Sequence, residues 1–137
     1  MADQHYEVLI IGGGTAGIMT AAQLLKERRA LKVGIIEPSE KHYYQPAWTL
    51  VGAGDYDFKK TERQERDFIP KGADWIKDRA VEMAPDNNEV RTEKGTSYTY
   101  DYLLVAPGLK MDLDALPGLR EALDKDLVCS YYVDPPQ

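Results

Sequence analysis

The sequence predicts an α/β fold in which a parallel sheet with a βαβ unit is joined by a three-stranded antiparallel meander. Three observations predict this fold. A continuous apolar run at residues 6–11 stops at three consecutive glycines, residues 18–25 carry apolar side chains at helical spacing, and a second apolar run occupies residues 32–36. Continuous apolar runs are typical of parallel strands that are covered on both faces. We expect one domain over residues 1–137, because this length suits a single hydrophobic core.

The composition excludes several classes of function. The net charge of −6 argues against nucleic acid as a partner, because phosphates repel an acidic surface. One cysteine and two histidines are too few for an internal disulfide or a Cys/His metal site, so we expect no metal. No apolar stretch approaches ~20 residues, and the N-terminus lacks a basic region followed by an apolar run. We therefore expect a cytoplasmic chain without a signal or transmembrane segment.

The first predicted strand, residues 6–11, leads through the glycines into a predicted helix. Ile18, Ala21 and Leu25 recur at the spacing of one helix face. The basic residues at 26–29 are expected to end this helix, because cations are favoured near a helix C-terminus. The strand at residues 32–36 is expected to run parallel to the first, since a helical crossover returns the chain in the same direction.

The turn between this strand and this helix reads Gly-Gly-Gly-Thr-Ala-Gly at residues 12–17, which fits the GxGxxG pattern. In such a turn Gly12 allows the tight exit from the strand, and Gly14 lets the backbone approach a pyrophosphate. Gly17 lets the helix pack close to the strand, and the free N–H groups of the helix start face the phosphates. The pattern alone is weak evidence, but here it follows a strand and opens a helix.

A carboxylate stands at the end of the second predicted strand. Glu37 follows Gly17 by 20 residues. A carboxylate there can accept hydrogen bonds from a ribose, and it repels the 2′-phosphate of NADP. The sequence therefore predicts a site for the ADP half of a dinucleotide. FAD is favoured over NAD, because flavoproteins with a separate nicotinamide-type domain place their FAD unit at the extreme N-terminus.

The rest of the chain continues without the alternating pattern of further βα units. Residues 38–72 are broken by prolines and glycines, and the charged run at 59–67 is interpreted as a solvated helix. The meander strands are predicted at residues 75–83, 89–92 and 97–100, and a further apolar strand at 102–106. An NAD-dependent Rossmann dehydrogenase is one alternative, but it would require βα units between residues 38 and 100.

Several longer motifs resemble one family of flavoproteins. They are Glu37-Pro38-Ser39-Glu40, His42-Tyr43-Tyr44-Gln45-Pro46, Thr49-Leu50-Val51-Gly52-Ala53-Gly54, Trp75-Ile76-Lys77 and Tyr102-Leu103-Leu104-Val105-Ala106-Pro107-Gly108. With them the chain resembles the pyridine nucleotide–disulfide oxidoreductases, and among these the sulfide:quinone oxidoreductases, over nearly its whole length. The resemblance implies a Rossmann-like FAD-binding domain, incomplete at the C-terminus, that is the N-terminal portion of a larger flavoprotein.

The resemblance also implies which residues hold FAD. Backbone N–H groups at the helix start would meet the pyrophosphate, Glu37 the adenosine ribose, and the backbone of Val81 the adenine. Gln45 lies in a loop that would reach along the cofactor, and the end of the second apolar strand would close over it. The implied cofactor-binding residues are Gly12, Gly14, Thr15, Ala16, Gly17, Glu37, Gln45, Val81, Ala106 and Gly108.

The reaction of this family requires a pair of cysteines beside the flavin. There sulfide is oxidised, and the electrons pass through FAD to a membrane quinone. The thiolate is the attacking species, and this chain has only Cys129. We treat Cys129 as a weak catalytic candidate, and we favour its interpretation as a small buried residue in or near a strand. The chain alone is expected to be inactive.

Sulfide and a quinone are the implied substrates of the full-length protein. Peripheral membrane association through segments outside this chain is implied as well, either in the cytoplasm or on the cytoplasmic face of a bacterial membrane. Two further alternatives stay open: a type II NADH dehydrogenase-like flavoprotein and a non-catalytic nucleotide-binding remnant. His42 is interpreted as a hydrogen-bonding residue rather than a proton carrier.

Overall fold

The computed structural model of the chain describes residues 4–130 and residue 132. The chain divides into a first unit, Met1–His42 with Gln64–Gly108, and a second unit, Tyr43–Arg63 with Leu109–Gln137. In chain order the elements are β1 (His5–Ile11), α1 (Thr15–Glu27), β2 (Val33–Ile36), β3 (Lys41–Tyr43), η1 (Gln45–Ala47), α2 (Trp48–Gly52), η2 (Phe58–Lys60), β4 (Glu62–Gln64), η3 (Glu65–Asp67), β5 (Ala73–Ile76), β6 (Ala80–Ala84), η4 (Pro85–Asn87), β7 (Glu89–Thr92), β8 (Ser97–Val105), η5 (Leu113–Ala115) and α3 (Leu119–Asp124). Within the described ranges, none of these helices has the length and apolar character needed to cross a membrane.

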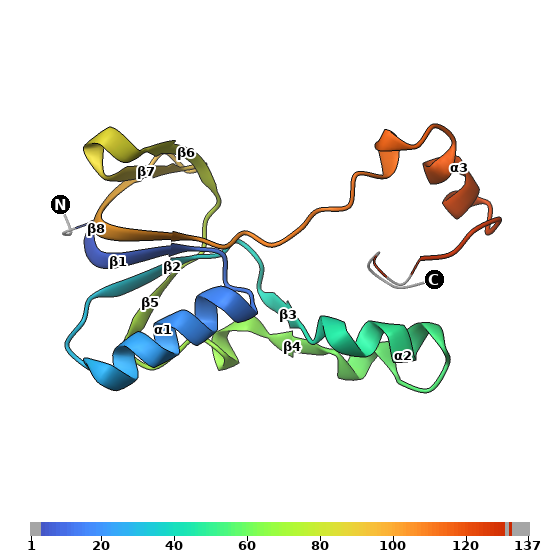
Figure 1. Ribbon diagram of the computed structural model, residues 1–137, viewed down its shortest axis with the longest axis horizontal. Helices are drawn as coiled ribbons and strands as arrows, with labels where there is room; N and C mark the ends of the chain where they lie inside the picture. Colours follow the sequence, from blue (N-terminus) through green and yellow to red (C-terminus); the bar gives the residue numbers. More distant parts are fainter. Residues whose placement is uncertain (1–3, 131, 133–137) are drawn as a thin grey trace. The chain divides into compact units, whose positions relative to one another are not determined.

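Six strands of the first unit form one sheet in the order β5-β2-β1-β8-β7-β6 (Figure 1). The strands β5, β2, β1 and β8 are parallel, and β7 and β6 continue from β8 in antiparallel pairing. In the centre, Ile10 is paired with Ile35 on one side and with Leu104 on the other. β8 runs without a break through both strands predicted over residues 97–106. This sheet confirms the predicted α/β fold with a βαβ unit and a three-stranded meander.

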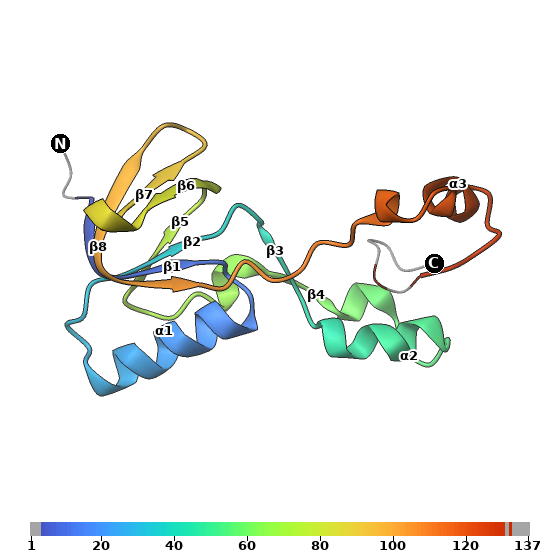
Figure 2. The same cartoon turned by 45° about the horizontal axis from the view of Figure 1, so that its top comes forward.

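The two faces of the parallel strands are buried by different elements (Figures 1 and 2). One face packs against α1 through Val8, Ile10, Ala21, Leu25, Val33 and Ile35. The other face packs against the antiparallel strands through Tyr6, Leu9, Ile11, Ile36, Val90 and Tyr100. Successive residues of β1 therefore point into two different apolar layers. Burial of each large aliphatic side chain contributes about 1.5–3 kcal/mol, so the carboxyl ends of β1 and β2 are held firmly at one edge.

The strand predicted at residues 75–83 is in fact two strands, which corrects the prediction. β5 ends at Ile76 in the parallel sheet, and β6 begins at Ala80 in the meander. The buried Asp78 turns the chain between them: its N–H donates to the carbonyl of Ile76 at 2.8 Å, and its carboxylate accepts from the N–H of Arg79 at 2.8 Å. A side chain that caps its own turn breaks a strand without any proline or glycine.

The charged run at residues 59–67 is not the predicted solvated helix. It forms η2, β4 and η3, and the side chain of Glu65 within it is buried, with the whole residue 1% exposed. β4 pairs with β3 in a separate two-stranded sheet. Between residues 38 and 100 the one α-helix is the five-residue α2. These residues therefore lack the βα units that a Rossmann dehydrogenase would require.

The second unit has its own aromatic core. The rings of Tyr43 and Phe58 stack with centroids 5.8 Å apart, and Trp48 meets the Tyr43 ring edge-on at 5.7 Å. Trp48 is buried and donates from Nε1 to the hydroxyl of Thr61 at 3.2 Å. A buried indole with a satisfied N–H is a stable arrangement, so this cluster fixes the segment between β3 and β4.

Candidate functional site

Gly12 turns the chain sharply where β1 ends. Its φ is +106°, and a Cβ on it would lie 2.1 Å from the carbonyl oxygen of Ala106. Its N–H donates to the carbonyl of Ile36 at 2.9 Å, and the N–H of Ala106 donates to the carbonyl of Ile11 at 2.8 Å. Only glycine suits this combination of positive φ and close approach. The turn is thus held between the ends of β2 and β8, in agreement with the expected role of Gly12.

Gly17 and Gly14 have opposite surroundings. A Cβ on Gly17 would lie 2.0 Å from the carbonyl oxygen of Gly12, so α1 packs directly against the turn. A Cβ on Gly14 would meet nothing within 4 Å. At the start of α1, where Thr15 and Ala16 lie, there is no side-chain cap and no acidic residue in the first turn. Open space beside uncapped N–H groups is what an approaching phosphate requires.

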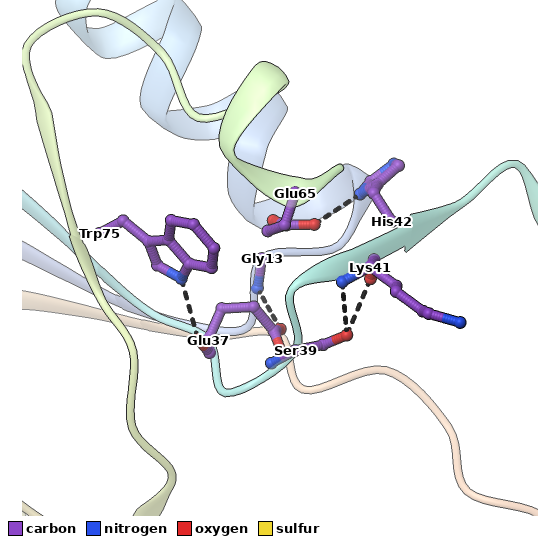
Figure 3. Close-up of polar contacts among 7 residues, drawn as sticks. All are labelled: Gly13, Glu37, Ser39, Lys41, His42, Glu65 and Trp75. Atoms are coloured by element: carbon purple, nitrogen blue, oxygen red, sulfur yellow. Dashed lines mark hydrogen bonds and ion pairs between the residues drawn. The ribbon is translucent and has the colours of Figure 1, made fainter. Parts of the chain in front are cut away.

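The carboxylate of Glu37 points into the glycine turn (Figure 3). Its Oε2 accepts from the N–H of Gly13 at 2.8 Å, and its Oε1 accepts from the N–H of Ser39 at 2.7 Å. The indole Nε1 of Trp75, on β5, donates to the backbone carbonyl of Glu37 at 2.9 Å. These three bonds fix both the backbone and the side chain of Glu37 at the end of β2.

A cavity of about 310 Å³ opens beside this carboxylate. It is lined by Ile11, Gly12, Ile36, Glu37, Pro38, Ser39, Arg79, Ala80 and Pro107. The cavity lies at the carboxyl ends of β1 and β2, which is where open parallel sheets bind their ligands. Its size, the carboxylate of Glu37 and the cation of Arg79 fit the nucleoside end of a dinucleotide.

Val81 has an unusual position in β6. The pairing of β6 with β7 shifts between Ala80 and Glu82, so that Val81 has no partner residue in the register. Val81 is 52% exposed, and the nearby Arg79 and Ala80 line the cavity. A β-bulge of this kind re-aims backbone groups that would otherwise join the ladder. The geometry is compatible with the expected backbone contact from Val81 to adenine, which stays a prediction.

Three predicted site residues are not among those that line the cavity. Gly108 follows β8 in the first unit with a φ of +76° and nothing within 4 Å of a Cβ. Gln45 begins η1 in the second unit and is exposed, so its expected contact with the cofactor stays a prediction. Cys129 is exposed in the second unit and follows α3 without joining a strand. Its interpretation as a buried residue in or near a strand is therefore wrong.

The sequence reasoning missed one residue of the site, Glu65. Its Oε2 lies 3.1 Å from Nδ1 of His42, whose ring stacks on Phe68 with centroids 4.7 Å apart. Its Oε1 lies 2.4 Å from the place that a Cβ on Gly13 would take (Figure 3). His42 is thus a hydrogen-bonding residue, as expected. A glutamate within a charged run carries no local signal that it turns inward.

Burial governs the electrostatics of Glu65. Burial raises the pKa of the Glu65 carboxyl, the nearby charge of Glu37 raises it further, and the hydrogen bond and charge of His42 oppose both effects. Among the described residues, Glu65 Oε1 has no hydrogen-bond partner. The site therefore holds two carboxylates, one satisfied by backbone N–H groups and one that is only half satisfied.

Comparison with known proteins connects this geometry with a family. A family model described as pyridine nucleotide-disulphide oxidoreductase matches residues 6–132. A mitochondrial sulfide:quinone oxidoreductase of Dictyostelium discoideum is 47% identical over 127 residues, which is 92% of this chain and 28% of that protein. A type II NADH:quinone oxidoreductase of Staphylococcus epidermidis is 26% identical over 124 residues, 88% of this chain and 31% of that protein.

A solved structure agrees with the sequence comparison. The sulfide:quinone oxidoreductase of Aquifex aeolicus superimposes with a TM-score of 0.67 and 31% identity, over 78% of this chain and 25% of that one. The chain thus spans less than a third of the length of the relatives it matches. The matched region includes the glycine turn, Glu37 and the cavity beside them.

Proposed function

Since the chain belongs to the pyridine nucleotide-disulphide oxidoreductase family, we propose that it forms the FAD-binding part of a sulfide:quinone oxidoreductase. The proteins of this family and the sulfide:quinone oxidoreductases are FAD-binding flavoproteins, in agreement with the cofactor expected from the sequence. The observation that carries the proposal is the bond from the Gly13 N–H to Glu37, because it supports a role for this carboxylate in binding a ribose beside the glycine turn.

Each part of the site has a proposed task in binding. The N–H groups at the start of α1 hold the pyrophosphate, with the open space at Gly14 for its close approach. Glu37 accepts hydrogen bonds from the adenosine ribose, and the bulged backbone at Val81 meets the adenine. Bound FAD would supply the two-electron chemistry, while this chain binds and orients it.

The substrates belong to the whole protein. We propose sulfide as the electron donor and a quinone as the acceptor, because the relatives that are 47% and 31% identical carry both in their names. A quinone is an apolar membrane molecule, so peripheral membrane association is part of this proposal. The cysteine pair that the reaction needs cannot come from this chain alone, which contains one cysteine.

Two matched chimeras test the proposal. In the first, this chain replaces the matched segment of the Dictyostelium sulfide:quinone oxidoreductase, and in the second the matched segment of the Staphylococcus type II NADH:quinone oxidoreductase. We expect the first to purify with the absorption bands of oxidised flavin at about 370 and 450 nm, and we expect sulfide to bleach these bands. The second is expected to retain little NADH-dependent bleaching.

The opposite pattern would overturn the assignment. Activity restored in the NADH:quinone background but not in the sulfide:quinone background would move the chain to the type II dehydrogenases. Absence of flavin from both chimeras would favour a non-catalytic remnant. A first chimera that carries Glu37→Ala serves as the matched control, and it should lose flavin on dialysis while the unsubstituted chimera keeps it.

A further inference from the structure

Gly13 lies between two carboxylates (Figure 3). A Cβ on it would lie 2.6 Å from Cγ of Glu37 and 2.4 Å from Oε1 of Glu65. Both oxygens of Glu37 accept from backbone N–H groups, whereas Glu65 has one oxygen on His42 and one without a partner among the described residues. The residues that line the cavity do not include Glu65, so Glu65 can act on a ligand only through the turn.

Burial of a charged carboxylate in this position destabilises the fold unless a proton compensates the charge. Glu65 and His42 can share one proton in two ways, as a carboxylate with an imidazolium or as a carboxylic acid with a neutral imidazole. Either arrangement leaves the pair without net charge. When the pair loses this proton, a net negative charge remains beside the turn, in addition to that of Glu37.

Other charged groups do not take over this compensation. Glu37 faces Glu65 from the end of β2, and His42 faces it from β3. The backbone carbonyl of Glu40 accepts a hydrogen bond from the N–H of Glu65. The carboxylate of Glu40 pairs with Lys77 at 2.8 Å and is also attracted by the charge of Arg66. The ring of Phe68 covers His42 without adding charge. Among the described residues, His42 is therefore the basic side chain that is in contact with Glu65.

We propose that Glu65 and His42 form a positioning pair behind the nucleotide-binding turn, and that this pair must hold one proton for a dinucleotide to bind. The proposal rests on the proposed function, because it requires the pyrophosphate at this turn. A negative charge next to Gly13 repels the phosphates through the protein interior, where charges are weakly screened. Nucleotide binding is then linked to proton uptake, and the affinity falls by up to about tenfold per pH unit above the titration of the pair.

The test uses this chain with ADP-ribose as the probe, because its pyrophosphate charge is constant between about pH 6 and 9. We expect the dissociation constant measured by calorimetry to rise with pH in the unsubstituted chain. Glu65→Gln keeps the size of the side chain and removes its charge, so the dissociation constant should become independent of pH. His5→Gln, at the other histidine, is the control and should keep the pH dependence.

Two further readouts test the same linkage. Calorimetry in buffers of different ionisation enthalpy should measure uptake of about one proton per ADP-ribose bound at the alkaline end. In the nucleotide-free chain, the NMR signal of the Gly13 amide should shift with pH, and Glu65→Gln should abolish this shift. These measurements also report whether the variant is folded.

The outcomes separate this inference from the proposed function. Binding of ADP-ribose with a pH-independent dissociation constant and no proton uptake would overturn the positioning pair and leave the proposed function standing. The same pH dependence in Glu65→Gln as in the unsubstituted chain would also overturn it. If ADP-ribose does not bind at any pH, the linkage to the pair is overturned, whereas the proposed function is decided by the two chimeras.

Discussion

The backbone N–H of Gly13 donates to Oε2 of Glu37 at 2.8 Å, so the glycine turn and the end of β2 are joined by a charge-assisted hydrogen bond. The second oxygen of the same carboxylate is held by the N–H of Ser39. Glu37 is therefore fixed in place by the protein itself. A carboxylate oxygen can accept more than one hydrogen bond, so both oxygens keep capacity for ribose hydroxyls.

Replacement of Glu37 by alanine should weaken nucleotide binding. We expect Glu37→Ala to lower the affinity for ADP-ribose by about 1–3 kcal/mol, because charge-assisted bonds to the ribose are lost. Calorimetric titration measures this, with Glu82→Ala as the control, since Glu82 is an exposed carboxylate paired with Arg91 on the meander. Unchanged affinity in Glu37→Ala would remove Glu37 from the site.

Gly14→Ala should separate binding from folding. Its backbone has φ −72° and ψ −175°, which alanine adopts easily, and a Cβ there meets nothing within 4 Å. We expect the free energy of unfolding in urea to change by less than about 0.5 kcal/mol. Binding of ADP-ribose should be strongly weakened, because the added methyl occupies the space needed by the phosphate. A variant that binds as tightly as the unsubstituted chain would show that the phosphate lies elsewhere.

Gly12→Ala should instead damage the fold. A Cβ at this position would lie 2.1 Å from the carbonyl oxygen of Ala106, and the φ of +106° disfavours any side chain. We expect a loss of about 2–4 kcal/mol in the free energy of unfolding, as strain adds to steric overlap. Gly95→Ala is the matched control, because Gly95 has a φ of +85° but open space around it. Equal losses in the two variants would contradict the close approach.

Alkaline pH should destabilise the first unit through Tyr6. Burial of the phenol and the neighbouring Asp74 carboxylate raise the pKa of Tyr6 to about 12 from its ordinary value of 10.0. The folded chain therefore keeps this proton between pH 10 and 12 while the unfolded chain loses it, and the free energy of unfolding falls as pH rises through this window. Tyr6→Phe should show a shallower fall in urea titrations, whereas the exposed Tyr102→Phe should not. Identical slopes in all three chains would refute the prediction.

FAD and ADP-ribose should bind this chain with similar affinity. The proposed site in the first unit accounts for the ADP half alone, and the chain covers only 28% of its Dictyostelium relative. We therefore expect the remainder of the protein to supply most contacts to the flavin ring, and FAD binding to this chain to be weak. Fluorescence titration with FAD and competition by ADP-ribose measure both constants. If FAD binds more than about tenfold tighter than ADP-ribose, the flavin ring must be contacted by residues of this chain.

The features that the sequence predicted correctly depend on residues that are close together in the chain. The run before Gly12, the helical spacing after it and the distance from Gly17 to Glu37 are local, and all three appear as expected. The strand predicted at residues 75–83 merged β5 with β6, because the place of β5 beside β2 depends on the pairing of Trp75 with Ile35, 40 residues apart. Long-range pairing is not visible in the period of a short strand.

The part of the site that was missed has the same cause. Glu65 turns inward because β4 pairs with β3 and because its N–H is bonded to Glu40, neither of which the charged run reveals. Cys129 was expected in a strand from its apolar neighbours, yet it lies exposed after α3. Local composition describes how often a residue type is buried, and it does not decide which member of a run is buried.

The bond from Trp75 to Glu37 also gives the first unit a built-in optical reporter. The indole Nε1 is tied to the segment that ends β2, and the ammonium of Lys77 lies 4.2 Å from the ring centroid. Indole fluorescence responds to such neighbours, so a rearrangement at Glu37 should alter the emission wavelength or the intensity of Trp75. The chain has two tryptophans, and Trp48 belongs to the second unit. In Trp48→Phe, ligand arrival in the first unit can therefore be followed from a single emitter without any label.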